Sequence, residues 1–421
     1  MKILWLTGTV LPYVADKTGL RASKEGTWLK ILSDRLTESR DIEFVSVFAS
    51  DRKRLICGKD SRCTWYGFYT PRVPETRYNK RREILFGKII ERERPDIIHI
   101  WGTEYSFAAE MINAAHGRTP AVISIQGIIS ECAEKYTYKL PRDVVKGYTI
   151  HDLIRMDNIA AQQRRFRSRG RSEKEALKKA QYVIGRTAWD KKITKRINPA
   201  VKYYECEEIL RPEFYSGQVW SYEACRKHSI FMSQAYYPIK GMHIALEIAA
   251  GLKKKYPDLR LYTTGRDAEC KNISDHFRQN SYERYISKRI KELSLEDTVI
   301  YLGSLSAKDM LKQYLRANVY MQASILENSS NSLAEAMMTG VPAVASDVGG
   351  TISVAGECGR GMLFDIEDID KAVTLIDGIF SNNPEDQDNT LEYARVYTLR
   401  RHNIDRVFSQ YIACYKDILK G

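Results

Sequence analysis

The 421-residue sequence has no uninterrupted apolar run that approaches the roughly 18 residues needed to span a membrane as a helix. Its first residues, MKILWLTGTVLPY, lack the small-residue cleavage pattern of a signal peptide, so we expect them to form a β-strand. The eight Cys are scattered and include no C-x-x-C pair, which disfavours both a zinc site and a disulfide framework. Together these absences predict a cytoplasmic protein with reduced thiols.

Short β-rich runs alternate with helical patterns along the chain. The strand-like runs of the first half are KILWLTG, EFVSVFA, DIIHIWG, AVISIQG and YVIGRT, and those of the second half are SIFMSQA, LRLYTTG, TVIYLGS, NVYMQAS and AVASD. Apolar strands separated by helices are typical of buried parallel sheets. Because the chain is too long for one ordinary core, we predict an α/β protein of two doubly wound, Rossmann-like domains facing across a cleft.

The formal net charge of +13 concentrates in three basic segments, Gln162–Gln181, Asp51–Arg54 and Asn79–Glu83. A solvated helix face, a nucleic-acid site, and a site for an anionic membrane or a phosphorylated substrate would each explain it. The sequence has no nucleic-acid-binding motif and no aromatic residues at stacking spacing among these charges, so we expect no nucleic acid as a partner. The other two interpretations stay open.

The stretch SILENSSNSLAEAMMTGVPAVASDVGG, residues 324–350, holds unusually dense hydrogen-bonding chemistry. A strand is expected to end at Ser324, and Asn331 or Ser332 is expected to cap the following helix, which stops at Gly340 before Pro342. The N-terminus of a helix presents backbone N–H groups and partial positive charge, which suits an anion such as phosphate.

Two carboxylates flank this helix start. We expect Glu335 in the first helical turn, where it can accept hydrogen bonds from both hydroxyls of a ribose. Glu327, on the preceding loop, can accept hydrogen bonds from a second polyhydroxylated group. The alternative is that Glu335 only stabilises the helix N-terminus and that the loop has no ligand.

The pattern S-x-x-E-N-S-x-N-S-L-x-E-A-M-x-x-G-V-P-x-V-A-S-D-V-G-G resembles the donor-site signature of family 4 glycosyltransferases, which are retaining enzymes with the GT-B fold. The stretch YYPIKGMHIALEIAAGLKKKYPDLRLYTTG resembles the phosphate-binding K-G turn of that family and the elements that follow it. The stretch DTVIYLGSLSAKDMLKQYLRANVYMQAS resembles the part that builds the nucleobase pocket.

The resemblance implies roles for individual residues of a nucleotide-sugar site. Glu335 would bind the ribose, Glu327 the donor-sugar hydroxyls and Lys240 the diphosphate. Leu302 and Gly303 would lie near the nucleobase. The residues that would donate hydrogen bonds to the sugar and the diphosphate are Asn328, Ser329, Asn331, Ser332 and Leu333.

The chain departs from the family pattern at two catalytic positions. Ala235 stands where the family usually has an Arg that binds the diphosphate. Arg186 is our candidate replacement for that Arg. The equal alternative is that Arg186 only forms an ordinary ion pair at the end of its strand. Gln126 stands where the family often has a His near the donor sugar, and Gln cannot act as a base. The predicted catalytic set is therefore Glu327, Lys240, Arg186 and Gln126, with the departing diphosphate taking the acceptor proton in a same-face displacement.

The resemblance also assigns domains. Residues 1–205 would form the N-terminal acceptor-binding domain, residues 206–385 the C-terminal nucleotide-sugar-binding domain, and residues 386–421 a helical tail that packs back on the first domain. On the acceptor side we expect Glu104 and also Gly26, Thr27 and Trp28, which stand where the family usually has a double-Gly loop. The stretches WGTEYSFA, which contains Glu104, and IQGIIS resemble a subset of enzymes of bacterial surface-polysaccharide synthesis. No metal and no cofactor besides the nucleotide-sugar substrate is expected, since the D-x-D triplet at Asp368–Asp370 is typical of a helix cap.

The predicted function is transfer of a sugar, with retention and without metal, from a nucleotide sugar to a polysaccharide or lipid-linked oligosaccharide acceptor. The alternative is a catalytically impaired GT-B subunit that binds a nucleotide sugar; an epimerase or hydrolase is disfavoured by the lack of suitable acids and His. The basic segment Tyr138–Lys179 is predicted to hold an anionic membrane surface or a diphosphate lipid, which would place the protein peripherally at the inner face of the membrane.

Overall fold

The computed structural model describes residues 1–20, 29–71, 77–115, 117–268, 277–381 and 388–421. By their contacts these residues form two compact units. Unit 1 comprises Met1–Glu131, Arg165–Pro212 and Arg401–Gly421, and unit 2 comprises Cys132–Arg164 and Glu213–Arg400. No helix among the residues described is long and apolar enough to cross a membrane.

Unit 1 is built on an eight-stranded sheet in the order β3-β4-β2-β1-β5-β6-β7-β8. Its strands are β1 (Lys2–Thr7), β2 (Glu43–Ser50), β3 (Ile56–Lys59), β4 (Cys63–Tyr69), β5 (Ile97–Trp101), β6 (Ala121–Ser124), β7 (Tyr182–Gly185) and β8 (Lys202–Glu205). Only the β3–β4 pair is antiparallel. Its helices are α1 (Pro12–Thr18), α2 (Lys30–Glu38), α3 (Lys80–Glu93), α4 (Phe107–Ala115), α9 (Ala188–Ile197) and α18 (Ile404–Leu419).

Unit 2 contains a six-stranded parallel sheet in the order β11-β10-β9-β12-β13-β14. Its strands are β9 (Ser229–Met232), β10 (Arg260–Thr263), β11 (Val299–Tyr301), β12 (Val319–Gln322), β13 (Ala343–Ser346) and β14 (Leu363–Phe364). Its helices are α6 (Arg142–Lys146), α7 (Ile150–Arg155), α10 (Met242–Lys253), α12 (Ser281–Glu292), α13 (Ala307–Arg316), α14 (Asn331–Thr339), α15 (Thr351–Ala355), α16 (Ile369–Ser381) and α17 (Asp388–Arg401).

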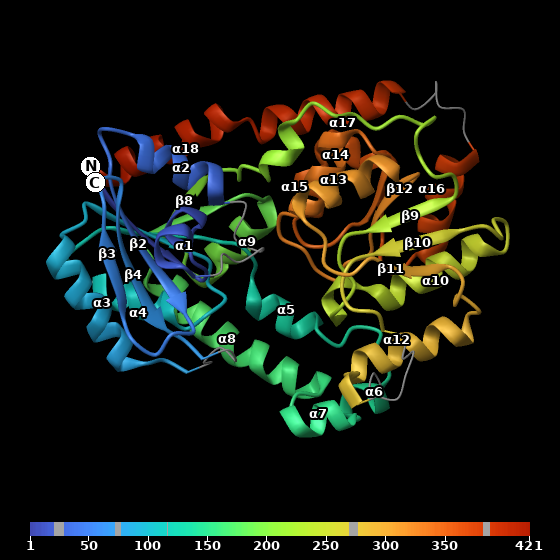
Figure 1. Ribbon diagram of the computed structural model, residues 1–421, viewed down its shortest axis with the longest axis horizontal. Coiled ribbons are helices and arrows are strands. Elements are labelled where there is room, and N and C mark those ends of the chain that lie inside the picture. Colours follow the sequence, from blue (N-terminus) through green and yellow to red (C-terminus); the bar gives the residue numbers. More distant parts are fainter. Residues whose placement is uncertain (21–28, 72–76, 116, 269–276, 382–387) are drawn as a thin grey trace. The chain divides into compact units, whose positions relative to one another are not determined.

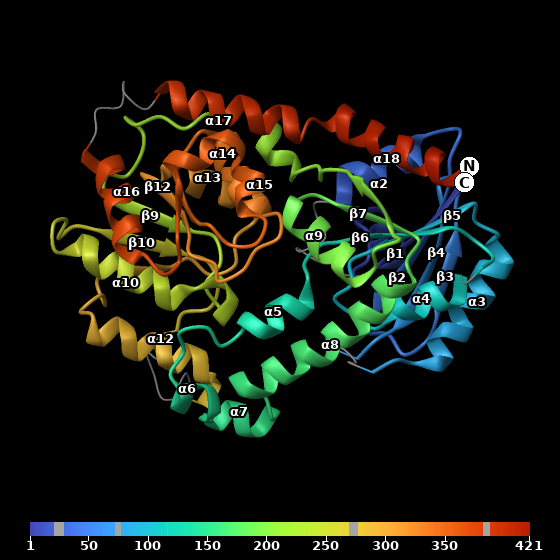
Figure 2. The ribbon, with the colours of Figure 1, turned by 180° about the vertical axis from the view of Figure 1, so that it is seen from behind.

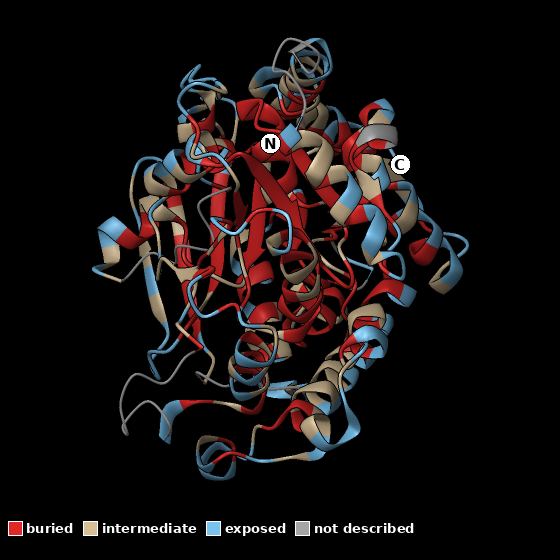
Figure 3. Cartoon of the chain, turned by 90° about the vertical axis from the view of Figure 1, so that its right-hand side faces the viewer, coloured by how far each residue is buried: buried red, intermediate tan, exposed pale blue. Residues whose placement is uncertain are grey.

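Two further helices, α5 (Ile129–Lys135) and α8 (Ile159–Lys179), have residues in both units, and the last residue of α17, Arg401, also belongs to unit 1. Helices flank each sheet, and the strands form the most deeply buried layer of the structure (Figures 1 and 3). The central strand β5 has five buried residues in succession, as expected for a strand covered on both faces. The predicted class, two doubly wound parallel sheets, is confirmed.

The C-terminal tail forms two helices, where one long helical tail was expected. The break lies at His402 and Asn403, and the Asn403 side chain caps α18 by accepting a hydrogen bond from the backbone N–H of Arg406 at 2.9 Å. Helix α18 packs within unit 1, where the hydroxyl of Tyr415 lies 3.2 Å from Nε1 of Trp5 and 2.5 Å from Nδ1 of His99. His99 is fully buried in β5, as predicted for a core position.

The contact-based units differ from the linear domain boundaries that we expected. Residues 132–164 were assigned to the first domain, but their contacts lie in unit 2, where α6 and α7 run beside α12 (Figures 1 and 2). Residues 388–400 likewise belong to unit 2, and only the last 21 residues of the tail belong to unit 1. The acceptor and donor roles of the two domains stay predictions.

Candidate functional site

The strand order of unit 2 reverses between β9 and β12, and the main candidate site lies there. In a doubly wound sheet, ligands bind beyond the carboxyl ends of the strands at such a switch point. A small pocket, of about 230 Å³ including its mouth, opens at this position. It is lined by Met232, Ser233, Gln234, Lys240, Tyr320, Met321, Gln322, Ser324, Glu327, Ser330 and Ser332.

Lys240 and Glu327 meet in this pocket, 87 residues apart in the sequence. The Nζ atom of Lys240 lies 2.5 Å from Oε1 of Glu327, which also accepts a hydrogen bond from the hydroxyl of Ser324 at 2.8 Å. Burial lowers the pKa of Lys240, but the neighbouring Glu327 carboxylate more than reverses this, so the pKa lies above its ordinary value. Lys240 is therefore a fixed positive charge at the pocket wall.

Two glycines allow the two loops of the pocket to approach each other. Gly241 ends the turn that carries Lys240, with φ of +72°, and a Cβ atom there would lie 1.8 Å from the carbonyl oxygen of Ala323. Gly349 has φ of +57°, and its Cβ would lie 2.1 Å from the carbonyl oxygen of Glu327. Because only Gly tolerates both the left-handed backbone and the close contact, the sequence requires Gly at these positions.

The helix that follows the loop of residues 323–330 is α14, and its start differs from our expectation. Ser330 is the N-cap, and its hydroxyl accepts a hydrogen bond from the backbone N–H of Leu333 at 3.2 Å. The expected caps, Asn331 and Ser332, are the first two residues of the helix itself. The N-terminus of α14 nevertheless faces the pocket, because both Ser330 and Ser332 line it.

Glu335 lies in the second turn of α14, so its predicted place in the first turn was wrong. It is only 2% exposed, and the hydroxyl of Tyr314 donates a hydrogen bond to its Oε2 at 3.4 Å. Tyr314 also donates to the backbone oxygen of Ser332 at 3.1 Å and thereby links α13 to the start of α14. A role of Glu335 in binding ribose stays a prediction.

The other predicted donor residues surround the pocket without lining it. Asn328 and Leu333 are buried, and Ser329 is half-buried on the same loop. Leu302 and Gly303 directly follow β11, where the backbone N–H of Gly265 donates to the oxygen of Gly303 at 3.0 Å. They therefore lie at the same carboxyl edge of the sheet, two strands away from β9.

The sequence analysis missed several pocket residues that strands contribute, chiefly Ser233, Tyr320 and Gln322. Tyr320 and Gln322 belong to β12, and Ser233 follows β9. The hydroxyl groups of Ser233 and Tyr320 lie 3.3 Å apart. Their position at the ends of two strands next to the switch point was the available signal.

In unit 1 the structure brings together Gln126, Arg186 and Glu104. Arg186 is 7% exposed, and its Nη1 lies 2.5 Å from Oε2 of Glu208. Its Nη2 donates to the backbone oxygen of Gln126 at 3.1 Å. The ion pair with Glu208 is the alternative that we held open for Arg186, and a role as a diphosphate-binding cation stays a prediction.

Glu104 follows β5 and receives a hydrogen bond from the backbone N–H of Gly127, the neighbour of Gln126. Burial raises the pKa of the Glu104 carboxyl and the nearby Glu173 carboxylate raises it further, whereas Arg169 lowers it in part, which leaves a pKa of about 7. Glu104 can therefore gain or lose a proton near neutral pH. The other predicted acceptor-side residues, Gly26, Thr27 and Trp28, lie outside the described residues.

This raised pKa predicts a pH-dependent stability that Glu104→Gln should remove. Between its ordinary pKa of 4.5 and about 7, folded Glu104 holds a proton that the unfolded chain releases, so the free energy of unfolding falls as pH rises through this window. Allowing for its partial exposure, the wild type should lose about 2 kcal/mol more than the variant between pH 5 and pH 8. Urea unfolding at both pH values measures this, and parallel losses in the two proteins would refute the assignment.

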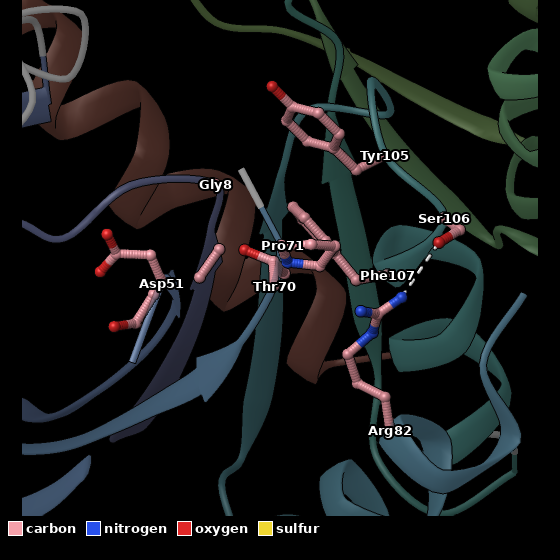
Figure 4. A pocket seen from close by; sticks show the side chains of 10 residues that line it. Gly8, Asp51, Thr70, Pro71, Arg82, Tyr105, Ser106 and Phe107 are labelled. Carbon is pink, nitrogen blue, oxygen red and sulfur yellow. Dashed lines mark hydrogen bonds between the residues drawn. The ribbon is translucent and has the colours of Figure 1, made fainter. Parts of the chain in front are cut away.

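A second pocket, of about 620 Å³ including its mouth, lies at the switch point of unit 1, between β1 and β5 (Figure 4). It is lined by Gly8, Ala49, Ser50, Asp51, Thr70, Pro71, Arg82, Tyr105, Ser106 and Phe107. Arg82 is held in place, because Nη2 donates to Oε1 of the fully buried Glu110 at 2.8 Å and to the hydroxyl of Ser106 at 3.1 Å.

Within the described part of the chain, no group of three or more His, Cys, Asp or Glu side chains could hold a metal ion. The Asp368–Asp370 triplet lies at the start of α16, where Oδ1 of Asp368 accepts a hydrogen bond from the backbone N–H of Lys371 at 3.0 Å. Its predicted interpretation as a helix cap is confirmed. Independence of metal stays a prediction.

The fold built on these two sheets is similar to that of solved structures. The structure is similar to sucrose-phosphate synthase from Thermosynechococcus elongatus over 100% of both chains, with a TM-score of 0.72 and 15% sequence identity. The predicted fold, GT-B, is thereby confirmed. Residues 224–397, all within unit 2, match the family described as Glycosyl transferases group 1.

The chain is also similar in sequence to two curated glycosyltransferases. The chain is 28% identical over 130 residues, 31% of its own length and 29% of the relative, to D-inositol 3-phosphate glycosyltransferase of Corynebacterium urealyticum. It is 25% identical over 180 residues, 43% of its own length and 44% of the relative, to GDP-mannose:cellobiosyl-diphosphopolyprenol alpha-mannosyltransferase of Xanthomonas oryzae pv. oryzae. The chain thus spans less than half of each of these relatives.

Proposed function

We propose that this protein is a retaining glycosyltransferase that moves a sugar from a nucleotide sugar to a polysaccharide or lipid-linked oligosaccharide acceptor. The observation that carries the proposal is the pairing of Lys240 with Glu327 at the switch point of the part that matches the group 1 family, beside the N-terminus of α14. Nucleotide-sugar use is supported by a relative whose name specifies GDP-mannose.

Different residues of the pocket would bind different parts of the donor. Its lining includes Lys240, Glu327 and Ser332, and these side chains suit the diphosphate and the sugar of the donor. Lys240 and the helix N-terminus supply positive charge for the diphosphate. Glu327 accepts hydrogen bonds from sugar hydroxyls, and its ion pair keeps it next to the diphosphate.

In the proposed reaction, the bond between the anomeric carbon and the diphosphate oxygen breaks and the diphosphate leaves with the electron pair. The acceptor hydroxyl forms the new bond on the same face, and its proton passes to the departing diphosphate. The Lys240 ammonium stabilises the negative charge that develops on the leaving group. This route requires no protein base, which is compatible with Gln126 at the position where the family that the chain resembles often has a His.

The pocket of unit 1 supports an acceptor site. Asp51 offers a carboxylate and Tyr105 an aromatic ring on different sides of this pocket, and both groups are common in sugar binding (Figure 4). The name of the Xanthomonas relative specifies a diphosphopolyprenol-linked saccharide. We therefore favour a lipid-linked saccharide as the acceptor.

Turnover of UDP-, GDP- and ADP-sugars, with lipid-linked saccharides as acceptors, tests the proposal. We expect transfer from one donor, a product with the anomeric configuration of that donor by NMR, and unchanged rates in the presence of a chelator. Inversion of configuration would refute the retaining mechanism, and a loss of activity with chelator would refute metal independence.

A second candidate function is a binding subunit without catalytic activity. Ala235 stands where a diphosphate-binding Arg is expected, and Arg186 is engaged with Glu208. Tight binding of a nucleotide sugar without turnover on any acceptor would favour this function.

A further inference from the structure

Five large apolar side chains are exposed in the short stretch from residue 148 to residue 156. They are Tyr148, Ile150, Leu153, Ile154 and Met156, and the last three are 61%, 78% and 79% exposed. No other nine-residue stretch of the described chain contains more than two such side chains. A single exposed apolar side chain is common on protein surfaces. A cluster of them is typical of a surface that binds a membrane or another molecule.

Three polar side chains in and next to this stretch, those of Thr149, Asp152 and Asn158, are buried instead, which inverts the usual arrangement. Asp152 is fully buried, and its carboxylate accepts a hydrogen bond from the backbone N–H of Ser281, at the start of α12, at 2.9 Å. Thr149 and Asp152 form a capping box at the start of α7. Asn158 is 2% exposed, and its side chain donates to the backbone oxygens of Lys146 and Gly147 at 3.2 and 3.1 Å.

Further contacts fix the surrounding segment to unit 2. Nε2 of His243, on α10, lies 3.1 Å from the backbone oxygen of Tyr138, and Arg284 donates to the oxygen of Tyr148 at 3.2 Å. Lys139 lies 2.9 Å from the carboxylate of Glu367. The polar groups thus hold α6 and α7 beside α12 (Figures 1 and 2). The apolar side chains of α7 are left at the surface.

The charge around this apolar cluster is positive. The exposed charged residues between 142 and 164 are four basic ones and one acidic one, namely Arg142, Lys146, Arg155, Arg164 and Asp143. The adjoining helix α12 adds three exposed basic residues, Arg284, Lys288 and Lys291, and one exposed acidic residue, Glu292. Apolar side chains surrounded by Lys and Arg are the composition of segments that lie in the interface of an anionic bilayer.

We propose that α7 and its flanking residues dock this protein on an anionic lipid bilayer. Leu153, Ile154 and Met156 enter the boundary between headgroups and acyl chains, and the surrounding basic residues contact headgroup phosphates. A helix of six residues is too small for a stable interface with a second protein, which buries about 800 Å² on each partner. The inference deepens the proposed function, because it names the partner that presents a lipid-linked acceptor, and it narrows the predicted membrane contact from residues 138–179 to α7.

Flotation of the full chain with vesicles tests this inference. The vesicles are phosphatidylcholine alone or phosphatidylcholine with about 30 mol % phosphatidylglycerol. Wild type should bind the anionic vesicles, and the triple variant L153S/I154S/M156S should bind them at least about tenfold less tightly. The control variant L55S/I84S removes two exposed apolar side chains of unit 1, which are 46% and 52% exposed, and should bind like wild type.

A second variant separates charge from apolar contact. R142Q/K146Q/R155Q should weaken binding to anionic vesicles by about tenfold or more, since each basic residue near an anionic surface contributes about 1 kcal/mol. Absence of wild-type binding, or equal binding of the L153S/I154S/M156S variant, would overturn the inference. A second copy of the chain would cover the cluster if wild type formed a dimer without lipid and the L153S/I154S/M156S variant were monomeric. That result would also overturn the inference.

Hydrolysis of nucleotide sugars, measured with the same protein samples, tests the proposed function separately from the docking surface. Vesicle binding by wild type without release of nucleoside diphosphate from any nucleotide sugar would overturn the proposed function alone. Hydrolysis by wild type without vesicle binding would overturn the docking surface alone.

Discussion

Replacing Lys240 by Met should lower kcat/KM for donor turnover by about 10²–10³-fold, the usual effect of removing one group that stabilises charge in a transition state. Lys240 is the cation in the donor pocket that pairs with Glu327, and its pKa stays above the ordinary value. Met keeps most of the side-chain volume but removes the charge. Release of nucleoside diphosphate, measured over a range of donor concentrations, gives kcat and KM separately, and kcat should fall.

Lys255→Met is the matched control for this variant. Lys255 is also in unit 2 and also forms an ion pair, 2.6 Å from Asp377, but its side chain is 60% exposed. An exposed pair contributes at most about 1 kcal/mol, so this variant should keep the kinetic constants of wild type. If Lys240→Met kept kcat within a few-fold of the control, Lys240 would have no catalytic role.

Gly241→Ala should lower the free energy of unfolding by about 3 kcal/mol or more and abolish donor binding. The new Cβ would lie 1.8 Å from the carbonyl oxygen of Ala323, so the turn that carries Lys240 must move away from the loop of residues 323–330. This backbone collision adds to the cost of about 1 kcal/mol for placing a side chain at positive φ. Denaturant unfolding and calorimetric titration with nucleoside diphosphates measure the two effects.

Gly217→Ala isolates the collision from the backbone preference. Gly217 also lies in unit 2 with a similar φ of +77°, but a Cβ atom there would meet no atom within 4 Å. We expect this variant to lose only about 1 kcal/mol and to bind nucleotide like wild type. Equal losses of stability in the two variants would show that the close approach at Gly241 is unimportant.

The sequence was sufficient to predict the buried parallel strands, because near-continuous apolar runs that alternate with helices are typical of few structures besides a sheet covered on both faces. All ten predicted strand-like runs are strands. The hairpin of β3 and β4 was missed because its antiparallel pairing interrupts the alternation of strand and helix, although CTWYGFY is rich in β-forming aromatic residues. The edge strand β8 was missed because its run KYYE is charged at both ends and partly exposed, and β14 was missed because it has only two residues.

The division into units could not be predicted from local sequence. Asp152 and Ser281 are 129 residues apart, and their hydrogen bond helps to place residues 132–164 in unit 2. Nothing in the Arg-rich pattern around this segment shows which sheet it will contact. The exposure of the apolar side chains of α7 could not be predicted either, since Leu and Ile residues such as Leu153 and Ile154 are expected to lie in a core.

The candidate site was predicted better than its detailed geometry. Lys240 and Glu327 were predicted from their motifs, and the structure brings them together. The cap at Ser330 was missed because the consecutive polar residues in SSNS are equally good candidates. The partner of Arg186 was not foreseeable, because Glu208 lies 22 residues further along the chain, beyond β8.

The most direct test of the central claim is the release of nucleoside diphosphate from a panel of UDP-, GDP- and ADP-sugars by wild type, Lys240→Met and Lys255→Met. The account predicts that wild type and Lys255→Met turn over the same donor at similar rates and that Lys240→Met is slower by about 10²-fold or more. Turnover by Lys240→Met at the wild-type rate, or no turnover and no binding of any donor by wild type, would contradict it.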